Sequence, residues 1–190
     1  MNHTAELLFP TLVNIIETDV NDKVKPYCLK AKETDPVGVA LTNSGGWQSK
    51  GNLENNLITD SLYQIFEKTI KNLYIPNLKI INHWININGP SNFNVLHDHP
   101  MSELSGVYYV DVPENSGEIY FENPQCFKQY AELSAYKKEF AQSMKQHINT
   151  YLKPKEGMLL IFPSHLQHGV TPNQSDKDRI SISFNIRMVG

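Results

Sequence analysis

Alternation of apolar and polar residues is clearest near the end of the chain. Over residues 179–188, RISISFNIRM, isoleucine and phenylalanine take every second position, and arginine, serine and asparagine lie between them. Side chains two apart in a strand share a face, so this pattern predicts a strand with one apolar and one polar face. Residues 78–88, 104–112, 117–122 and 157–162 are further predicted strands, because each is rich in β-branched or aromatic residues and lies beside a Gly or Pro turn signal.

The earlier part of the chain carries other patterns. Residues 53–74 place apolar side chains at helical spacing, and Pro76 stops the helix, so we predict a helix that covers a sheet. Residues 7–16 predict an opening strand broken by Pro10, and residues 43–51, NSGGWQSKG, are a loop by composition. Many short strands separated by Gly/Pro turns are typical of a sandwich, barrel or jelly roll.

Residues 126–150 interrupt the strands with a loose helical pattern. A long insertion between strands is often a lid or a binding loop, but plain packing is an equal alternative. The 190 residues fit one domain spanning 1–190.

Composition narrows the class of protein. The net charge is −3 and no basic stripe is present, which argues against a nucleic-acid or membrane-surface partner. No apolar run is long enough to span a bilayer, and the first residues lack the pattern of a signal peptide. Cys28 and Cys126 form no CxxC pair, so we interpret them as two incidental thiols of a cytoplasmic protein. A homodimer is only the base-rate expectation.

The first candidate metal ligands are the three adjacent residues His97, Asp98 and His99. In a strand His97 and His99 point the same way and Asp98 points away, so the two imidazoles converge unless the backbone is not extended there. A third ligand must come from elsewhere, and His165 or His168 offers it, just after an apolar strand.

The spacing of these histidines does not decide which metal they would bind. Two histidines and one carboxylate are the usual set for Fe(II), whereas three imidazoles also describe a catalytic zinc site. Ordinary surface or hydrogen-bonded histidines are the default interpretation of an isolated His-x-His.

Arg179 and Ser181 add a second feature, because they share the polar face of the last predicted strand. An inward-facing guanidinium needs an anionic partner, and together with the hydroxyl it suits a carboxylate. A diacid such as 2-oxoglutarate would supply that carboxylate while its ketoacid end chelates the metal. A salt bridge within the protein is the alternative.

These residues lie in stretches that resemble a known family. HDHP, LSGVYYV, GMLLIFPSHLQHGV and RISISFN are similar to the 2-oxoglutarate/Fe(II) oxygenases of a bacterial and bacteriophage family in the prolyl-hydroxylase-like superfamily, and the resemblance covers nearly the whole chain. It implies a mainly β fold, a double-stranded β-helix (jelly roll) core with flanking α-helices. It also implies Fe(II) and 2-oxoglutarate, with O2, as cofactor and cosubstrates.

Carried over position by position, His97 and His168 match the iron histidines. His99 stands where most of the superfamily has Asp or Glu, although members of the closer family share the histidine. A neutral third ligand makes the site more positive, which changes its affinity for 2-oxoglutarate and for zinc. Asp98 as the third ligand is the other alternative.

The same resemblance assigns Arg179 and Ser181 to the cosubstrate. Either Tyr108 or Tyr109 could donate a hydrogen bond to 2-oxoglutarate, although core packing is the default role for each tyrosine taken alone. Tyr109 and Asn94 are the two further residues that we assign to cosubstrate binding. Trp47, Gln48 and Asn185 are second-rank candidates for the pocket.

The resulting hypothesis is a 2-oxoglutarate- and Fe(II)-dependent dioxygenase that hydroxylates an unknown protein residue or small metabolite. The alternatives are a cupin-like zinc enzyme and a non-catalytic jelly-roll binding module.

Overall fold

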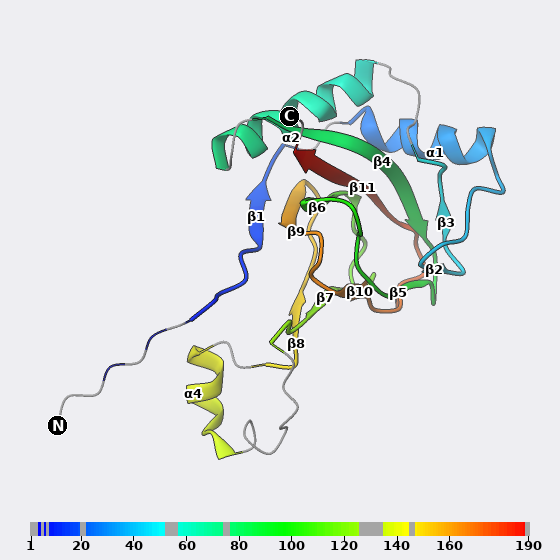
Figure 1. Ribbon diagram of the computed structural model, residues 1–190. Helices are drawn as coiled ribbons and strands as arrows, with labels where there is room; N and C mark the ends of the chain where they lie inside the picture. The colour runs from blue at the N-terminus through cyan, green and yellow to red at the C-terminus, as the bar shows by residue number, and fades with distance from the viewer. Residues whose placement is uncertain are drawn as a thin grey trace.

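Two antiparallel sheets carry the fold in the computed structural model (Figure 1). The structure describes residues 4, 6, 8–19, 22–51, 57–73, 77–125, 135–144 and 147–188. In this part of the chain the larger sheet has the order β1 (Asn14–Glu17), β9 (Met158–Pro163), β6 (Leu104–Asp111), β11 (Arg179–Met188), β4 (Leu78–Asn88) and β3 (Trp47–Gln48). The smaller sheet has the order β2 (Asn43–Ser44), β5 (Phe93–His97), β10 (His168–Val170), β7 (Ile119–Glu122) and β8 (Asn149–Leu152).

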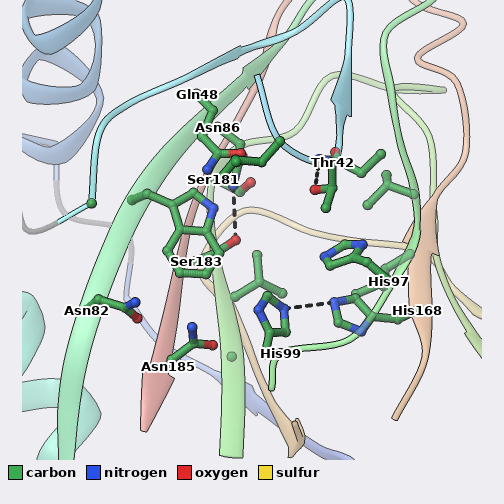
Figure 2. A pocket seen from close by; sticks show the side chains of 18 of the residues that line it. Thr42, Gln48, Asn82, Asn86, His97, His99, His168, Ser181, Ser183 and Asn185 are labelled. Atoms are coloured by element: carbon green, nitrogen blue, oxygen red, sulfur yellow. Dashed lines mark hydrogen bonds between the residues drawn. The ribbon is translucent and has the colours of Figure 1, made fainter. Parts of the chain in front are cut away.

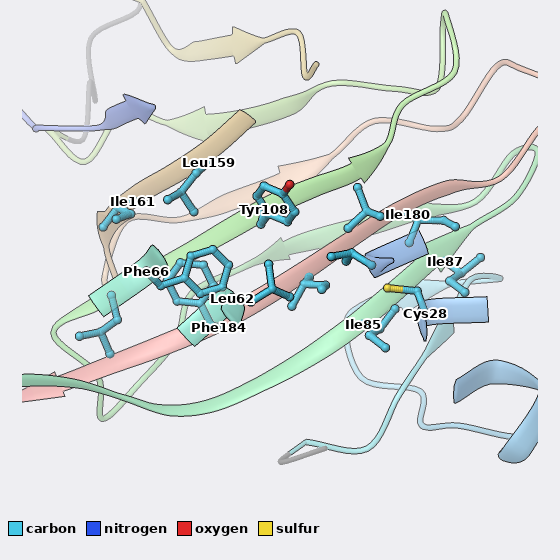
Figure 3. Close-up of a cluster of buried hydrophobic side chains, with 14 of the residues drawn as sticks. Cys28, Leu62, Phe66, Ile85, Ile87, Tyr108, Leu159, Ile161, Ile180 and Phe184 are labelled. Atoms are coloured by element: carbon cyan, nitrogen blue, oxygen red, sulfur yellow. The ribbon is translucent and has the colours of Figure 1, made fainter. Parts of the chain in front are cut away.

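Helices α1 (Val24–Thr34) and α2 (Leu57–Leu73) cover one face of the larger sheet (Figure 1). Helix α2 buries Leu62, Phe66 and Ile70, which recur at helical spacing, and Phe66 stacks on Phe184 of β11 with ring centroids 4.4 Å apart. Figure 3 shows this cluster between the helices and the sheet. Each such side chain contributes about 1.5–3 kcal/mol by leaving water. None of the described helices is long and apolar enough to cross a membrane.

The alternation in the last strand is confirmed. The isoleucines of β11 and Phe184 are buried in the cluster beneath the helices. The polar positions lie on the opposite face and line a cavity. The mainly β jelly roll with flanking helices, expected from the sequence, is therefore the observed fold.

Two boundary predictions are wrong. The predicted strand over 7–16 does not form over its described first part; β1 begins at Asn14 and pairs with β9 as far as Glu17. Phe9 has φ of 58°, which is not an extended conformation, and Pro10 lacks the N–H that a ladder needs.

The segment 43–51 contains two very short strands rather than only loop. Gly45, with φ of 78°, lies between them, and it allows β2 to pair with β5 while β3 pairs with β4.

The insertion predicted over 126–150 contains helix α4 (Lys138–Ser143) and the start of β8. Residues 126–134 and 145–146, and therefore Cys126, lie outside the described part of the chain. The helix predicted over 53–74 is observed as α2, and residues 53–56 and 74 also lie outside that part.

Candidate active site

A cavity of about 460 Å³ opens between the polar face of the larger sheet and the smaller sheet, a volume typical of small-molecule sites. It gathers all the residues proposed from the sequence as metal or cosubstrate ligands, although these residues are far apart along the chain. Its lining includes Asn94, His97, Asp98, His99, Tyr109, His168, Arg179 and Ser181.

Three histidines meet on one wall of this cavity (Figure 2). His97 is the last residue of β5 and lies opposite His168, the first residue of β10. His99 lies beyond the end of β5, where its backbone N–H donates to the carbonyl of Ser164 at 2.9 Å. One potential ligand atom from each histidine falls within 4.8 Å of the others. Strand alternation therefore does not bring His99 to the cluster; the turn before β10 does.

Hydrogen bonds to the backbone orient two of the rings. His97 Nδ1 lies 2.7 Å from the carbonyl of Val95, and His168 Nδ1 lies 2.9 Å from that of Leu166. Carbonyls only accept, so both Nδ1 atoms carry the proton and both Nε2 lone pairs are free for a metal.

The spacing and charge of the rings suit metal binding. The Nε2 atoms of His99 and His168 are 3.3 Å apart, and two nitrogens bound at ~2.0–2.1 Å to one ion lie roughly 2.9–3.4 Å apart. Burial, and then the proximity of His97, lower the pKa of His99 to about 4 and that of His168 to about 3. The pKa of His97 is also lowered, mainly by burial. Neutral imidazoles, the form that binds metals, therefore prevail at neutral pH.

The competing ligands lie elsewhere. His165 is exposed to solvent, and Asp98 is exposed at the cavity rim and does not belong to the cluster of ligand atoms. Among the described residues, the three imidazoles form the only group of three or more His, Cys, Asp or Glu side chains with this geometry.

At another point of the cavity, Arg179 is 3% exposed. Its Nη1 donates to the carbonyl of Ser116 at 2.6 Å, and no carboxylate of the described residues forms an ion pair with it. Burial lowers the pKa of Arg179, and Tyr109 opposes that shift. Burial also raises the pKa of Tyr109 to about 12 against the effect of Arg179, so Tyr109 is a neutral phenol.

The structure separates the two adjacent tyrosines. Tyr109 faces the cavity and lies opposite Ser181 of the neighbouring strand. Tyr108 points to the other face, where it packs against Phe66 with ring centroids 5.9 Å apart.

The remaining candidates divide into wall and packing residues. Both ends of the Asn94 amide are engaged, since Oδ1 accepts from Asn88 at 2.9 Å and Nδ2 donates to Thr42 at 3.4 Å. Trp47 is buried outside the cavity lining and its Nε1 donates to the carbonyl of Asp35, so it is a hydrophobic plug. Gln48 lines the cavity.

Strand β4 contributes a polar row that sequence reasoning did not single out: Asn82, Trp84 and Asn86 line the cavity. Trp84 contacts His99, with ring centroids 5.6 Å apart. The signal was present in the sequence, because these residues alternate with His83, Ile85 and Ile87 over the predicted strand.

The fold and this cavity define a jelly-roll protein in which one cavity holds three histidines that could bind a metal ion and, at another point, a buried arginine. The family model described as "Putative 2OG-Fe(II) oxygenase" matches residues 82–185, more than half of the chain. The chain therefore belongs to this family of 2-oxoglutarate- and Fe(II)-dependent oxygenases, which are oxidoreductases. The matched region contains all three histidines and Arg179.

Solved structures with the same fold are distant in sequence. A prolyl-4-hydroxylase from Pseudomonas putida has a TM-score of 0.63 at 15% identity, covering 88% of this chain and 85% of that one. A viral collagen prolyl hydroxylase from Paramecium bursaria Chlorella virus-1, in its 2-oxoglutarate complex, has a TM-score of 0.62 at 14% identity, covering 93% and 96%. HygX from Streptomyces hygroscopicus, with nickel, 2-oxoglutarate and hygromycin B bound, has a TM-score of 0.66 at 11% identity, covering 94% and 84%. No curated protein sequence matches the chain.

Proposed function

We propose that His97, His99 and His168 hold the Fe(II) of this family, and that Arg179 anchors 2-oxoglutarate for hydroxylation of a protein residue or small metabolite. The observation that carries this proposal is the isolation of Arg179. A buried guanidinium without an anionic partner is costly, and a carboxylate that enters the cavity would remove that cost.

The neighbours of Arg179 suit the same carboxylate. Ser181 lies on the same face of β11, and Tyr109 is a neutral phenol opposite it, so both can donate a hydrogen bond. Arg179, Ser181 and Tyr109 would together bind the far carboxylate of 2-oxoglutarate, while its ketoacid end faces the histidines. Asn94, whose amide joins Asn88 to Thr42, would hold the wall beside them.

The ligand set favours a dianionic cosubstrate. Three neutral imidazoles leave the full charge of a divalent ion uncompensated, whereas a carboxylate ligand would cancel part of it. The chain thus offers two centres of positive charge, the metal and Arg179, to the two ends of one diacid.

Bound Fe(II) supplies the oxidising chemistry, in which 2-oxoglutarate and O2 yield succinate and CO2 and one oxygen atom enters the substrate as hydroxyl. The residues of the chain position the reagents. His97 and His168, whose rings are oriented through Nδ1, would hold the metal beside the smaller sheet, and Arg179 would hold the cosubstrate beside the larger one. Apolar side chains of the lining, such as Phe162 and Ile119, limit the access of water between them.

The test needs no substrate. Metal-free protein would receive Fe(II) and then 2-oxoglutarate without O2, and the visible spectrum and bound metal would be recorded. We expect one Fe(II) per chain and a weak charge-transfer band in the wild type, and loss of both in His168→Ala. His165→Ala removes an exposed imidazole three positions away and is the matched control, which should keep the band.

Tightly bound zinc, together with a visible spectrum that 2-oxoglutarate does not change, would instead indicate a zinc enzyme on the same fold. Absence of stoichiometric metal would indicate a binding module.

Cellular location and assembly are separate proposals. The cytoplasm would keep Fe(II) and the free thiol of Cys28 reduced. A homodimer is a base-rate prediction that sedimentation of the purified chain would test.

A further inference from the structure

One end of the cavity is lined by two side-chain amides that belong to neighbouring strands. Asn185 of β11 and Asn82 of β4 are register partners, and Figure 2 shows both on the side of His99 that faces away from His97 and His168. Asn185 follows Arg179 by six positions on the same face of β11, which is roughly 20 Å at ~3.4 Å per residue. This end is therefore remote from the proposed cosubstrate anchor, and the histidines lie beside it.

The amide oxygen of Asn185 is engaged by a hydroxyl group. Its Oδ1 accepts from the hydroxyl of Ser105 at 2.8 Å, and the hydroxyls of Ser105 and Ser164 are also 2.8 Å apart. The single proton of Ser105 goes to Asn185, so Ser164 donates to Ser105.

This chain of hydrogen bonds uses the oxygen of Asn185 and turns its NH2 group toward the cavity. Asn185 is 8% exposed, and no described residue accepts a hydrogen bond from its Nδ2. This NH2 group is not among the unpaired side-chain atoms that are sealed from solvent, so an acceptor in the cavity can reach it.

Asn82 supplies the complementary group. Its Oδ1 is removed from solvent and has no hydrogen-bond partner among the described residues. The terminal torsion of asparagine is soft, so a small rotation brings this acceptor to a ligand in the cavity.

The surroundings of this pair are neutral. Of the charged side chains in the cavity lining, Lys50 is paired with Asp35 at 2.9 Å, Asp98 is exposed at the rim, and Arg179 lies at the far end. Trp84, which lines the same cavity and contacts His99, offers a flat apolar surface.

We propose that Asn82 and Asn185 form a subsite for a neutral carboxamide of the primary substrate, with Asn185 Nδ2 donating to its carbonyl and Asn82 Oδ1 accepting from its N–H. The carboxamide would be a peptide unit or a small-molecule amide. This inference names the substrate class and rests on the proposed function. The subsite pairs one hydrogen-bond donor, Asn185 Nδ2, with one unpaired acceptor, Asn82 Oδ1, in the cavity that also holds the three histidines.

Binding of three probes to the wild type loaded with Ni(II) and 2-oxoglutarate would test the proposal by ligand-observed NMR. N-methylbutanamide, the methylamide, carries one N-substituted carboxamide like a peptide unit, methyl butanoate is the matching ester without any N–H, and propionamide is a small primary amide. We expect the methylamide to bind about tenfold more tightly than the ester. Equal affinities would overturn the proposal. Propionamide that binds as well as the methylamide supports a small amide, and weaker propionamide binding supports a peptide unit.

Two isosteric variants make the direction of hydrogen bonding measurable. Asn185→Asp keeps the oxygen that Ser105 binds but replaces the donor, so methylamide affinity should fall about tenfold or more. Asn82→Asp introduces the same charge and keeps the acceptor, so its affinity for the methylamide should fall far less than that of Asn185→Asp. Equal losses in both variants would mean that charge or folding, not hydrogen bonding, explains the effect, and would overturn the proposal. Asn115→Asp, an exposed turn residue, is the matched control for charge.

The binding of 2-oxoglutarate separates this failure from that of the proposed function. A wild type that binds 2-oxoglutarate but no amide would contradict the carboxamide subsite alone. A wild type that binds no 2-oxoglutarate would contradict the proposed function. Amide binding to the metal-free protein would then still support the carboxamide subsite, and its absence would contradict the subsite as well.

Discussion

Replacement of Arg179 by methionine should change ligand binding and stability in different ways. Methionine keeps a long unbranched side chain but removes the charge. In the ligand-free protein Arg179 has one hydrogen bond, to the carbonyl of Ser116, and no described carboxylate partner. The variant loses that hydrogen bond, at a cost of about 1–3 kcal/mol, but it also loses the desolvation cost of an unpaired buried charge, which is several kcal/mol. The ligand-free protein should therefore not melt at a lower temperature.

The effect on 2-oxoglutarate is large. Loss of one partner of a buried charge pair costs about 2–5 kcal/mol, and 3 kcal/mol corresponds to roughly 150-fold in Kd. At a ligand concentration of about 100 Kd the wild type gains ~2.7 kcal/mol, whereas the variant gains only ~0.3 kcal/mol. For a chain of this size 1 kcal/mol moves Tm by about 2–4 °C, so the expected shifts are roughly 5–11 °C and ~1 °C.

Thermal melting with Ni(II), with and without 2-oxoglutarate, measures both quantities. Arg187→Met, an exposed arginine on the same strand, is the control and should keep the full shift. A full ligand shift in Arg179→Met would refute the assignment of the anchor. A much lower Tm of the ligand-free variant would show that Arg179 serves the fold.

Three further outcomes follow from the packing. Trp84 contacts the histidine cluster, so one equivalent of paramagnetic Ni(II) should quench the tryptophan fluorescence, and Trp84→Phe should abolish that saturable phase. Burial raises the pKa of Cys28 to about 12, so in a Cys126→Ser background this thiol should react with a disulfide reagent only after unfolding, and rapid reaction of the native chain would contradict its burial. The free energy of unfolding should also fall as pH rises through about 9–12, because in that range only the thiol of the unfolded chain ionises. Gly106→Ala places a methyl group against the ring of Phe184 and the backbone carbonyl of Leu160, so urea unfolding should show a loss of about 1–3 kcal/mol. An unchanged midpoint would show that both the ring and the neighbouring strand can move aside.

The sequence predicted much of the larger sheet and named the residues of the cavity that we propose as metal and cosubstrate ligands. The alternation over 179–188 predicted both faces of β11 correctly, because the strand is long and each face meets one environment: Ile182 and Phe184 lie under the helices, and Ser181 and Ser183 face the cavity. The family resemblance then predicted the jelly roll.

Elements that depend on tertiary contacts could not be predicted. Helix α1 buries only Val24 and Cys28, too few positions for a clear helical period, and its Lys25 pairs with Asp111 of β6 at 2.5 Å. Strands β5 and β10 are short, and they exist as partners of each other, with His97 opposite His168.

The geometry of His99 depends on such a contact as well. Its backbone hydrogen bond to Ser164 joins two segments that are far apart in the sequence, so the convergence of the imidazoles followed from the turn and not from the His-x-His spacing. The choice of His168 over His165 came from the family resemblance, and in the fold His168 is buried whereas His165 is exposed.

One strand therefore connects the proposed sites in a fixed order. Arg179 begins the polar face of β11 and Asn185 lies toward its other end, so cosubstrate anchor and carboxamide subsite are held at a constant separation by the pleat itself. A slip of one residue would place Ile180 and Phe184 in the cavity and would bury Arg179 under the helices. The apolar face under α1 and α2 makes that slip very costly, since the buried isoleucines and Phe184 would all lose their packing. The hydrophobic core thus fixes the register of the strand, and through the register it fixes which polar side chains face the cavity with the three histidines.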